Sequence, residues 1–298
     1  MPQLTNAGLL GNTGLGKETI LQLAKHNPSK IYLTSRSESK GQEALKSIRD
    51  TLGQSSVDLQ HVPLDLASFA SVKSAAESVQ SSTDRLDILI CNAGIMAIPP
   101  GKTEQGHEIQ FGTNHIGHHL LTKRLLPILE KTAALSGSDV RVITLSSVAN
   151  EQAPPIKTML DMEKLYTTGK WTCYGASKAG NILFAAELAR RYPTLTSVSV
   201  HPGIIKSDLW NSVNENNALI RFGMKLAGPL MFQTIQTGAH NTLWAAAGAK
   251  KDELQNGTYY TPVGKLDHRN PGNKRAKDVE AGRALWEWTE AEIVKVGS

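Results

Sequence analysis

Short apolar segments rich in β-branched residues alternate with longer amphipathic segments along much of the chain. The apolar segments are Ile31–Thr34, Val57–Leu64, Leu86–Cys91, Val140–Ser146 and Ser197–His201. The amphipathic segments between them are Leu15–His26, Glu38–Leu52, Ser68–Val79, His107–Glu130 and Tyr174–Tyr192. Strands and helices that alternate in this order predict an α/β fold, with a doubly wound parallel sheet and helices on both faces.

The alternation is interrupted after the last of these segments. A stretch near Asn211–Phe232 is rich in Leu, Met, Phe and Gly, and a helix is predicted next, at Thr234–Ala247. A strand at Gly257–Pro262 and a helix near Val279–Ile293 follow. Because no repeat or low-complexity linker divides the chain, we expect one domain over residues 1–298.

Composition narrows the class of protein. With 298 residues, 40% of them hydrophobic, the chain can bury a packed core. The net charge is +5, but Lys and Arg are scattered and only 5% of residues are aromatic, so no nucleic-acid partner is expected. Cys91 and Cys173 lack the spacing of a disulfide framework or a zinc site. No apolar run approaches the roughly 20 residues of a membrane-spanning helix and no signal pattern follows Met1, so we expect a cytoplasmic protein without an integral membrane segment.

The strongest chemical signal is the sequence YGASK, from Tyr174 to Lys178. Four-residue spacing on a helix places the phenol and the ammonium on one face, about a turn apart. A positive charge beside a tyrosine stabilises the phenolate and suits the pair to proton transfer. A lone Tyr-x-x-x-Lys is common by chance, however, so the interpretation depends on the rest of the chain.

Other polar motifs lie where predicted strands end. Ser147 follows the strand in VITLSS, and Asn92, Ala93 and Gly94 end LDILICNAG. The segment SVSVHPG ends a further strand and leads to Ser207. The carboxyl ends of parallel strands form the usual ligand side of an open α/β sheet, so these residues are expected near one site.

In combination, these motifs resemble the short-chain dehydrogenase/reductase family, and within it the retinol-dehydrogenase-like branch common in fungi and animals. Five matches occur in the family's order: NAG at Asn92, TEQGHEIQFGTNHIGHHLLT with Asn114, LSS ending at Ser147, YGASK, and HPGIIKS ending at Ser207. The resemblance implies a Rossmann-like fold, with a cofactor half at about residues 1–150 and a catalytic and substrate half at about 151–298.

The resemblance also implies four catalytic roles. Tyr174 would donate the proton in carbonyl reduction or accept it in alcohol oxidation, while hydride passes to or from a nicotinamide. Lys178 would lower the pKa of the tyrosine and hold the nicotinamide ribose. Ser147 would hydrogen-bond the substrate oxygen, and Asn114 would anchor a water in a proton relay to Lys178. For Ser147 and Asn114, a purely structural hydroxyl and a solvated helix residue stay open as alternatives.

Cofactor preference is read at the end of the second strand, IYLTSRS. No carboxylate stands there to accept from the free ribose 2′-hydroxyl of NAD, whereas Arg36 can meet the 2′-phosphate of NADP, with Ser35 beside it and Lys17 or Ser37 as further candidates. By resemblance, Asp65 would bind the adenine amino group. The expected cofactor is NADP(H), and its site comprises Gly11, Asn12, Gly14, Leu15, Gly16, Ser35, Arg36, Asp65, Leu66, Asn92, Ala93, Gly94, Tyr174, Lys178, Pro202, Gly203, Ile205 and Ser207.

The glycine-rich turn departs from the family's Thr-Gly-x-x-x-Gly-x-Gly. Aligned on Gly14 and Gly16, the segment LLGNTGLGKE puts Leu10 on the first glycine; alternatively, Gly11 is that glycine and the loop is one residue shorter. The preceding TNAG also has low β propensity for a first strand. Dinucleotide binding is expected to persist, with affinity reduced if this region is distorted.

Substrate and partner expectations are coarser. The family's variable substrate lid falls at 209–232, where apolar residues including Trp210, Phe222, Met224 and Met231 suggest a hydrophobic ligand. The family's habit favours a homodimer or homotetramer. The histidines 115, 118 and 119 lack partner ligands at metal-site spacing, so they are expected to pack or hydrogen-bond, and no metal is predicted.

The sequence therefore favours an NADP(H)-dependent oxidoreductase that interconverts a carbonyl and an alcohol on an apolar small molecule, with a role in secondary metabolism as one setting. Two alternatives stay open on the same fold. One is a non-redox catalyst such as a cyclase or isomerase, and the other is a binding protein whose cofactor site is impaired by the altered turn.

Overall fold

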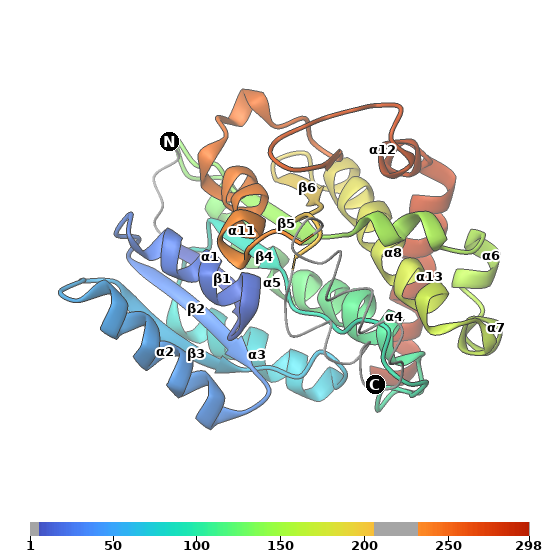
Figure 1. Cartoon of the computed structure of the whole chain (residues 1–298), viewed down its shortest axis with the longest axis horizontal. Helices are drawn as coiled ribbons and strands as arrows, with labels where there is room; N and C mark the ends of the chain where they lie inside the picture. Colours follow the sequence, from blue (N-terminus) through green and yellow to red (C-terminus); the bar gives the residue numbers. More distant parts are fainter. Residues whose placement is uncertain (1–5, 206–231, 298) are drawn as a thin grey trace.

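The computed structural model describes residues 6–205 and 232–297, which form one seven-stranded parallel sheet (Figure 1). The strand order is β3-β2-β1-β4-β5-β6-β7. The strands are β1 (Asn6–Gly11), β2 (Lys30–Ser35), β3 (Asp58–Pro63), β4 (Ile88–Cys91), β5 (Arg141–Leu145), β6 (Thr196–Val200) and β7 (Tyr259–Tyr260). The predicted α/β class is confirmed.

Helices connect the strands and cover both faces of the sheet. The longer ones are α1 (Gly14–Ala24), α2 (Glu38–Leu52), α3 (Phe69–Ser82), α5 (Gly117–Ala133), α8 (Lys170–Arg191), α11 (Ile235–Leu243) and α13 (Val279–Gly297). The shorter ones are α4 (Ile109–Phe111), α6 (Ile156–Met159), α7 (Met162–Thr167) and α12 (Pro271–Ala276). The described residues also form single turns of π-helix (Gly112–Ile116, Trp244–Gly248) and of 3₁₀-helix (Val148–Gln152, Lys251–Glu253).

Two apolar cores lie on opposite faces of the sheet. Helices α3, α5, α8 and α13 pack on one face, around residues such as Val72, Leu125 and Leu183. Helices α1 and α2 cover the other face with Ile20 and Leu45, and α11 lies beside α1 although it comes from the far end of the chain (Figure 1). Burial of the central strands on both faces explains why β4 and β5 read as nearly continuous apolar runs.

The first strand is better formed than its sequence suggested. Residues Asn6–Gly11 pair with β2 on one side and β4 on the other, although the register shifts between Ala7 and Leu10. The central position in the sheet accounts for this, because pairing with two neighbours outweighs the weak intrinsic β propensity of Asn, Ala and Gly.

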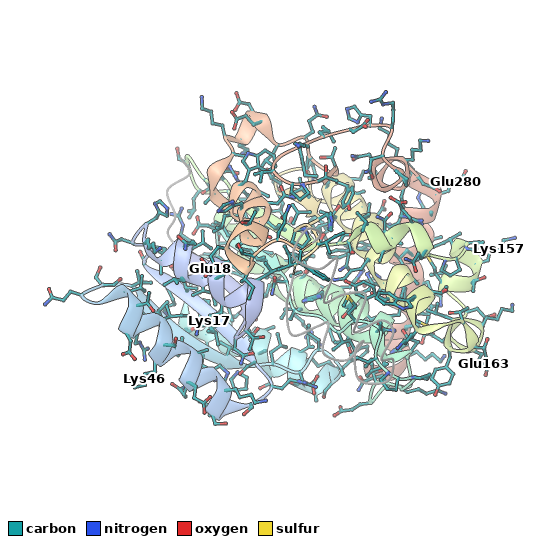
Figure 2. The ribbon with its side chains drawn as sticks, in the orientation of Figure 1. Lys17, Glu18, Lys46, Lys157, Glu163 and Glu280 are labelled. Carbon is teal, nitrogen blue, oxygen red and sulfur yellow. The ribbon has the colours of Figure 1, made fainter. Side chains whose placement is uncertain are left out.

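Other boundaries differ locally from the prediction. The expected helix His107–Glu130 begins at Ile109, is interrupted by the π-helical turn Gly112–Ile116 and ends at Ala133. Helix α8 begins at Lys170, one turn before the predicted start at Tyr174. Charged side chains such as Lys46, Lys157 and Glu280 lie on outer helices, consistent with a scattered rather than clustered surface charge (Figure 2).

The sheet topology fixes where a ligand can bind. Chain order reverses between β1 and β4, so the crossovers leave the sheet in opposite directions from this point. A crevice therefore opens outside the carboxyl ends of these strands. Among the described residues, no helix combines the length and apolar character needed to cross a membrane.

Candidate active site

A cleft of about 490 Å³ opens at the carboxyl ends of the central strands. Its walls contain most of the residues predicted for the cofactor site, from segments far apart in the chain. These are Gly11, Asn12, Gly14, Leu15, Ser35, Arg36, Asp65, Leu66, Asn92, Ala93, Gly94, Tyr174, Lys178 and Pro202. The fold thus brings together residues that the sequence placed only at separate strand ends.

The glycine-rich turn resolves the two possible alignments. Gly11 is the last residue of β1, and Thr13 precedes the first residue of α1. A Cβ atom on Gly16 would lie 2.5 Å from the Gly11 carbonyl oxygen and 2.7 Å from its nitrogen, so the helix start packs directly on the strand end. Gly14 has φ +52° and open space above it. Gly11 therefore occupies the place of the first glycine, in a loop that is one residue shorter than the family's.

Tyr174 and Lys178 lie on α8 and face the cleft from one side. Both are buried, at 7% and 6% exposed. The Lys178 ammonium donates to the Leu145 carbonyl oxygen at the end of β5 (3.1 Å) and lies 5.6 Å from the centre of the Tyr174 ring. The spacing of YGASK therefore produces the expected pair on one helix face.

Burial shifts the pKa values of both Tyr174 and Lys178. Burial raises the pKa of the Tyr174 phenol to about 12, although a hydrogen bond with Ser147 acts in the opposite direction. Burial also lowers the pKa of Lys178 to about 8. Removal of water thus disfavours the charged form of each group, whereas the lowering of the Tyr174 pKa by Lys178 stays a prediction.

Ser147 follows Ser146 after the end of β5 and caps the 3₁₀ turn Val148–Gln152. Its hydroxyl accepts from the Ala149 backbone N–H (3.2 Å) and hydrogen-bonds the Tyr174 phenol. Behind it, the Asn150 amide donates to the Ser147 carbonyl oxygen (2.7 Å). The turn thus holds the serine and tyrosine hydroxyls beside one another.

Asn114 lies in the π-helical turn and is fully buried behind Gly94. Its side-chain oxygen accepts from the Ile95 N–H (2.8 Å), and its amide donates to the Ile95 carbonyl (2.9 Å) and to Ser177 (2.9 Å). A Cβ on Gly94 would lie 2.9 Å from the Asn114 oxygen and 3.6 Å from the Lys178 ammonium. Asn114 therefore fixes the Asn92–Ile95 segment against the Lys178 side of the cleft. Single π-helical turns, like the one that contains Asn114, are frequent at functional sites.

Ser35 is the last residue of β2 and Arg36 follows it, and both line the cleft. Ser35 is buried and Arg36 is exposed. The Lys17 ammonium instead donates to Ser47 on α2 (2.8 Å), and Lys17 is not among the residues that line the cleft. The Asp65 carboxylate accepts from the Ala67 N–H (2.9 Å) and so shapes the turn after β3.

The remaining predicted residues lie beside the cleft or outside the described part of the chain. Gly203 has φ +99°, and Ile205 is buried against Gly238 of α11. Ser207 and the predicted lid residues Trp210, Phe222, Met224 and Met231 fall outside the described residues.

The histidine cluster ties the core to the C-terminal helix. His115 contacts the Thr289 hydroxyl (3.3 Å), and His119 contacts the Glu290 carboxylate (2.8 Å), both on α13. His118 hydrogen-bonds the Asn114 carbonyl oxygen (2.9 Å) through Nδ1. Each ring packs or hydrogen-bonds as predicted. Cys173 is also buried, and burial raises the pKa of its thiol.

Two buried histidines predict acid sensitivity. Burial lowers the pKa of His118 and of His201 to about 4, so both rings stay neutral in the folded protein while the unfolded chain takes up protons below about pH 6.5. Stability is then complete above about pH 6.5 and falls as the pH drops toward 4, by on the order of 3 kcal/mol per ring. Urea unfolding across this range measures the loss. His118→Asn should flatten it whereas the exposed-site control His26→Gln should not, and equal slopes in both variants would contradict the assignment.

Further residues of the cleft were not predicted from the sequence. They are Thr13, Thr34, Leu64, Ala67, Ile95, Ile98, Ile109, Thr113, Leu145 and Ser146. Ser146 and Leu145 could have been found from their place at the end of a predicted strand. The apolar residues Ile95 and Ile98 carry no such signal, because their segment is irregular, and nothing in the sequence marks Ile109, at the start of α4, as facing the cleft.

Comparison with known proteins agrees with this geometry. A short-chain dehydrogenase/reductase of Armillaria gallica is 37% identical over 98% of this chain and 92% of its own. Human retinol dehydrogenase 12 is 34% identical over 92% of this chain and 81% of its own. The crystal structure of an uncharacterised protein from Mycobacterium paratuberculosis superposes with a TM-score of 0.70 at 29% identity, covering 97% of this chain and 93% of the other. The family model described as short chain dehydrogenase matches residues 9–218. The chain belongs to the short-chain dehydrogenase/reductase family of oxidoreductases, which act on alcohols and carbonyls.

Proposed function

We propose that this protein is an NADP(H)-dependent oxidoreductase that interconverts a carbonyl and an alcohol on an apolar small molecule. The observation that carries the proposal is the cleft that joins the Gly11–Gly16 turn and Arg36 at one end to Tyr174 and Lys178 at the other. A dinucleotide needs contacts of this kind over its whole length, and the proton donor must lie where its nicotinamide ends.

The residues of the cleft fit such a cofactor. The start of α1 presents backbone N–H groups and the positive end of its dipole toward the turn, where a pyrophosphate would lie. Gly14 leaves the space above the turn open, and Gly94 allows close approach of the backbone beside Asn114. The remaining members of the predicted cofactor set lie along the same cleft or beside it, apart from Ser207.

The preference for NADP(H) rests on the end of β2. Residues Thr34–Ser37 include no carboxylate, and the exposed guanidinium of Arg36 borders the cleft next to the Ser35 hydroxyl. A guanidinium can bind a phosphate through two charge-assisted hydrogen bonds, whereas it gains little from a free ribose hydroxyl.

The apolar substrate rests on the wall near Tyr174. Ile95, Ile98 and Ile109 line the cleft there, and Trp171 packs edge-on to the Tyr174 ring with centroids 6.3 Å apart. The name of the human relative, a retinol dehydrogenase, also supports an apolar alcohol or aldehyde. A role in secondary metabolism is part of this proposal and is consistent with the similarity to short-chain dehydrogenase/reductases of fungi.

The reaction follows from the positions of the hydroxyl groups. The bound nicotinamide would supply or accept hydride at the substrate carbon. Ser147 would donate a hydrogen bond to the substrate oxygen, and Tyr174 would give that oxygen a proton in reduction or remove one in oxidation. Because its pKa is raised to about 12, Tyr174 is protonated at neutral pH, which is the form that reduction requires. Lys178 would hold the ribose, with Asn114 anchoring a water that relays protons to it.

Replacing Arg36 by Ala should weaken NADPH binding much more than NADH binding, because only NADPH carries the 2′-phosphate. Loss of a charge-assisted phosphate contact corresponds to about a tenfold or larger rise in Kd. Fluorescence titration with both cofactors measures it, and Arg269→Ala, at an exposed loop arginine, is the control. Equal losses for NADPH and NADH would contradict the preference.

The function itself is tested by turnover. Purified protein should consume NADPH in the presence of apolar ketones or aldehydes and not with polar sugars of similar size, followed by the loss of reduced-nicotinamide absorbance. Binding of NADPH without turnover of any carbonyl or alcohol would favour the non-redox alternative. We further expect a cytoplasmic homodimer or homotetramer, which size-exclusion chromatography with light scattering would test.

A further inference from the structure

A buried histidine lies directly behind the cleft at the end of β2. His61 of β3 contacts the Ser35 hydroxyl through Nε2 (2.9 Å) and the Glu38 carboxylate through Nδ1 (3.0 Å). Its side chain is 1% exposed, whereas that of Glu38 is 62% exposed. Ser35 itself lines the cleft next to Arg36. The imidazole is thus one hydrogen bond away from the part of the cleft assigned to the 2′-phosphate.

The surrounding helix leaves room for this ring. Gly41 of α2 lies over His61, and a Cβ atom at position 41 would overlap the imidazole. The ring is therefore held between α2 and β3 in one orientation, with each nitrogen directed at a different partner. Such a position differs from that of a surface histidine, which would be free to rotate.

The hydrogen bonds around Ser35 identify the protonation state that fits. The Ser35 hydroxyl donates to the Ser37 carbonyl oxygen (2.7 Å), which can only accept. Its oxygen is then left to accept from His61 Nε2–H, while Nδ1 must donate to the Glu38 carboxylate. Only the doubly protonated imidazolium makes all three hydrogen bonds together. A neutral ring must lose one of these hydrogen bonds. If Nδ1–H still donates to Glu38, Nε2 has no proton and accepts a hydrogen bond from the Ser35 hydroxyl, which then no longer donates to Ser37.

We propose that His61 is a specificity-determining residue that acts through Ser35 on the 2′-phosphate of NADPH. Protonated His61 donates a hydrogen bond to the Ser35 oxygen, so the Ser35 hydroxyl is free to donate its own proton to the phosphate instead of to Ser37. The imidazolium also places a positive charge behind that phosphate. Neutral His61 accepts the hydrogen bond of the Ser35 hydroxyl, so this hydroxyl cannot donate to the phosphate, and the negative charge of Glu38 is not compensated. NADPH binding should therefore strengthen as the pH falls, and NADH binding should not.

The other charged groups near His61 do not substitute for the effect of its protonation on phosphate binding. Glu38 on α2 faces Nδ1, and Arg36 follows Ser35 at the end of β2. Apart from Glu38, the residues that β2 and α2 place against the ring, Ser35 and Gly41, are uncharged. Protonation of His61 thus changes the net charge of the His61–Glu38 pair from negative to zero, which favours an anionic phosphate.

The inference rests on the proposed NADP(H) function, and its experiment separates the two. Kd values for NADPH and NADH are measured between about pH 6 and about pH 8. In the wild type, the preference for NADPH over NADH should fall about tenfold across this range, the change that corresponds to one pH unit of linkage. The 2′-phosphate itself titrates near about pH 6 in every variant, so the comparison between variants isolates the histidine.

His61→Gln keeps a neutral donor near Ser35 and should leave only the pH dependence that the 2′-phosphate itself contributes. His26→Gln removes an exposed histidine away from the cleft and should retain the wild-type profile. A His61→Gln profile that matches the wild type would overturn the inference while leaving the NADP(H) assignment intact. Absence of NADPH binding at every pH would instead overturn the proposed function.

A second measurement needs no variant. Calorimetric titration of the wild type with NADPH near neutral pH, in two buffers of different ionisation enthalpy, should show uptake of protons that is absent with NADH. Carbon-13 spectra of the His61 ring should move toward the imidazolium form with NADPH alone. No proton uptake and no change in the ring spectrum would also overturn the inference.

Discussion

Replacing Tyr174 by Phe should lower turnover by about 10²- to 10⁴-fold, the usual contribution of a positioned proton donor, and leave NADPH affinity unchanged. The substitution removes one oxygen atom. The ring keeps its apolar contacts with Met96, Ala97 and Ala149 and its edge-on packing with Trp171, so neither the fold nor the cleft should change. Steady-state rates with any accepted carbonyl, together with NADPH titration, measure the two effects separately.

Tyr166→Phe is the matched control. Tyr166 lies on α7, with the Lys102 ammonium 5.4 Å from its ring centre, and it does not line the cleft. Its variant should retain wild-type rates. If Tyr174→Phe also retained them, another group would have to supply the proton, and the proposed role of Tyr174 would be wrong.

Replacing Gly16 by Ala should disrupt cofactor binding at the opposite end of the cleft. The added Cβ would meet the Gly11 backbone at 2.5 and 2.7 Å and the Asn92 amide nitrogen at 2.8 Å, contacts that side-chain rotation cannot relieve. The start of α1 must then move away from β1, at a cost of about 1–3 kcal/mol. We expect NADPH affinity to fall about tenfold or more as the backbone N–H groups of the turn are displaced.

Gly169→Ala provides the control for this change. Gly169 precedes α8 with φ −67°, and among the described residues no neighbouring atom lies within 4 Å of the position that an added methyl group would take, so the substitution should be neutral. Urea unfolding and NADPH titration of both variants distinguish local from global effects. Wild-type NADPH affinity in Gly16→Ala would show that the packing of α1 on Gly11 is unimportant for binding.

The sequence predicted the centre of the sheet because β4 and β5 are buried on both faces and therefore read as nearly continuous apolar runs. It predicted β1 poorly, since Asn6–Gly11 pairs through its central position rather than through propensity. It could not choose between the two alignments of the glycine turn, which depends on the close approach of Gly16 to Gly11 in space. The π-helical turn around Asn114 was also beyond pattern analysis, because its hydrogen bonds join α4 and α5 into one apparent helix.

The candidate site was also predicted only in part from the sequence. Spacing placed Tyr174 and Lys178 on one helix face, but the effect of burial on their pKa values needed the structure. His61 gave no signal in the sequence, since its importance comes from contacts with Ser35 and Glu38 across two strands and a helix. Roles that depend on burial or on through-space contacts thus require coordinates.

The proposed function requires that the cleft hold NADP(H) against Tyr174. Titration of the purified protein with NADPH and with NADH, followed by tryptophan fluorescence and by melting temperature, tests it most directly. We predict a saturable change with NADPH, a weaker one with NADH, and a higher melting temperature for the NADPH complex. Absence of any change with either cofactor up to millimolar concentration would contradict the account.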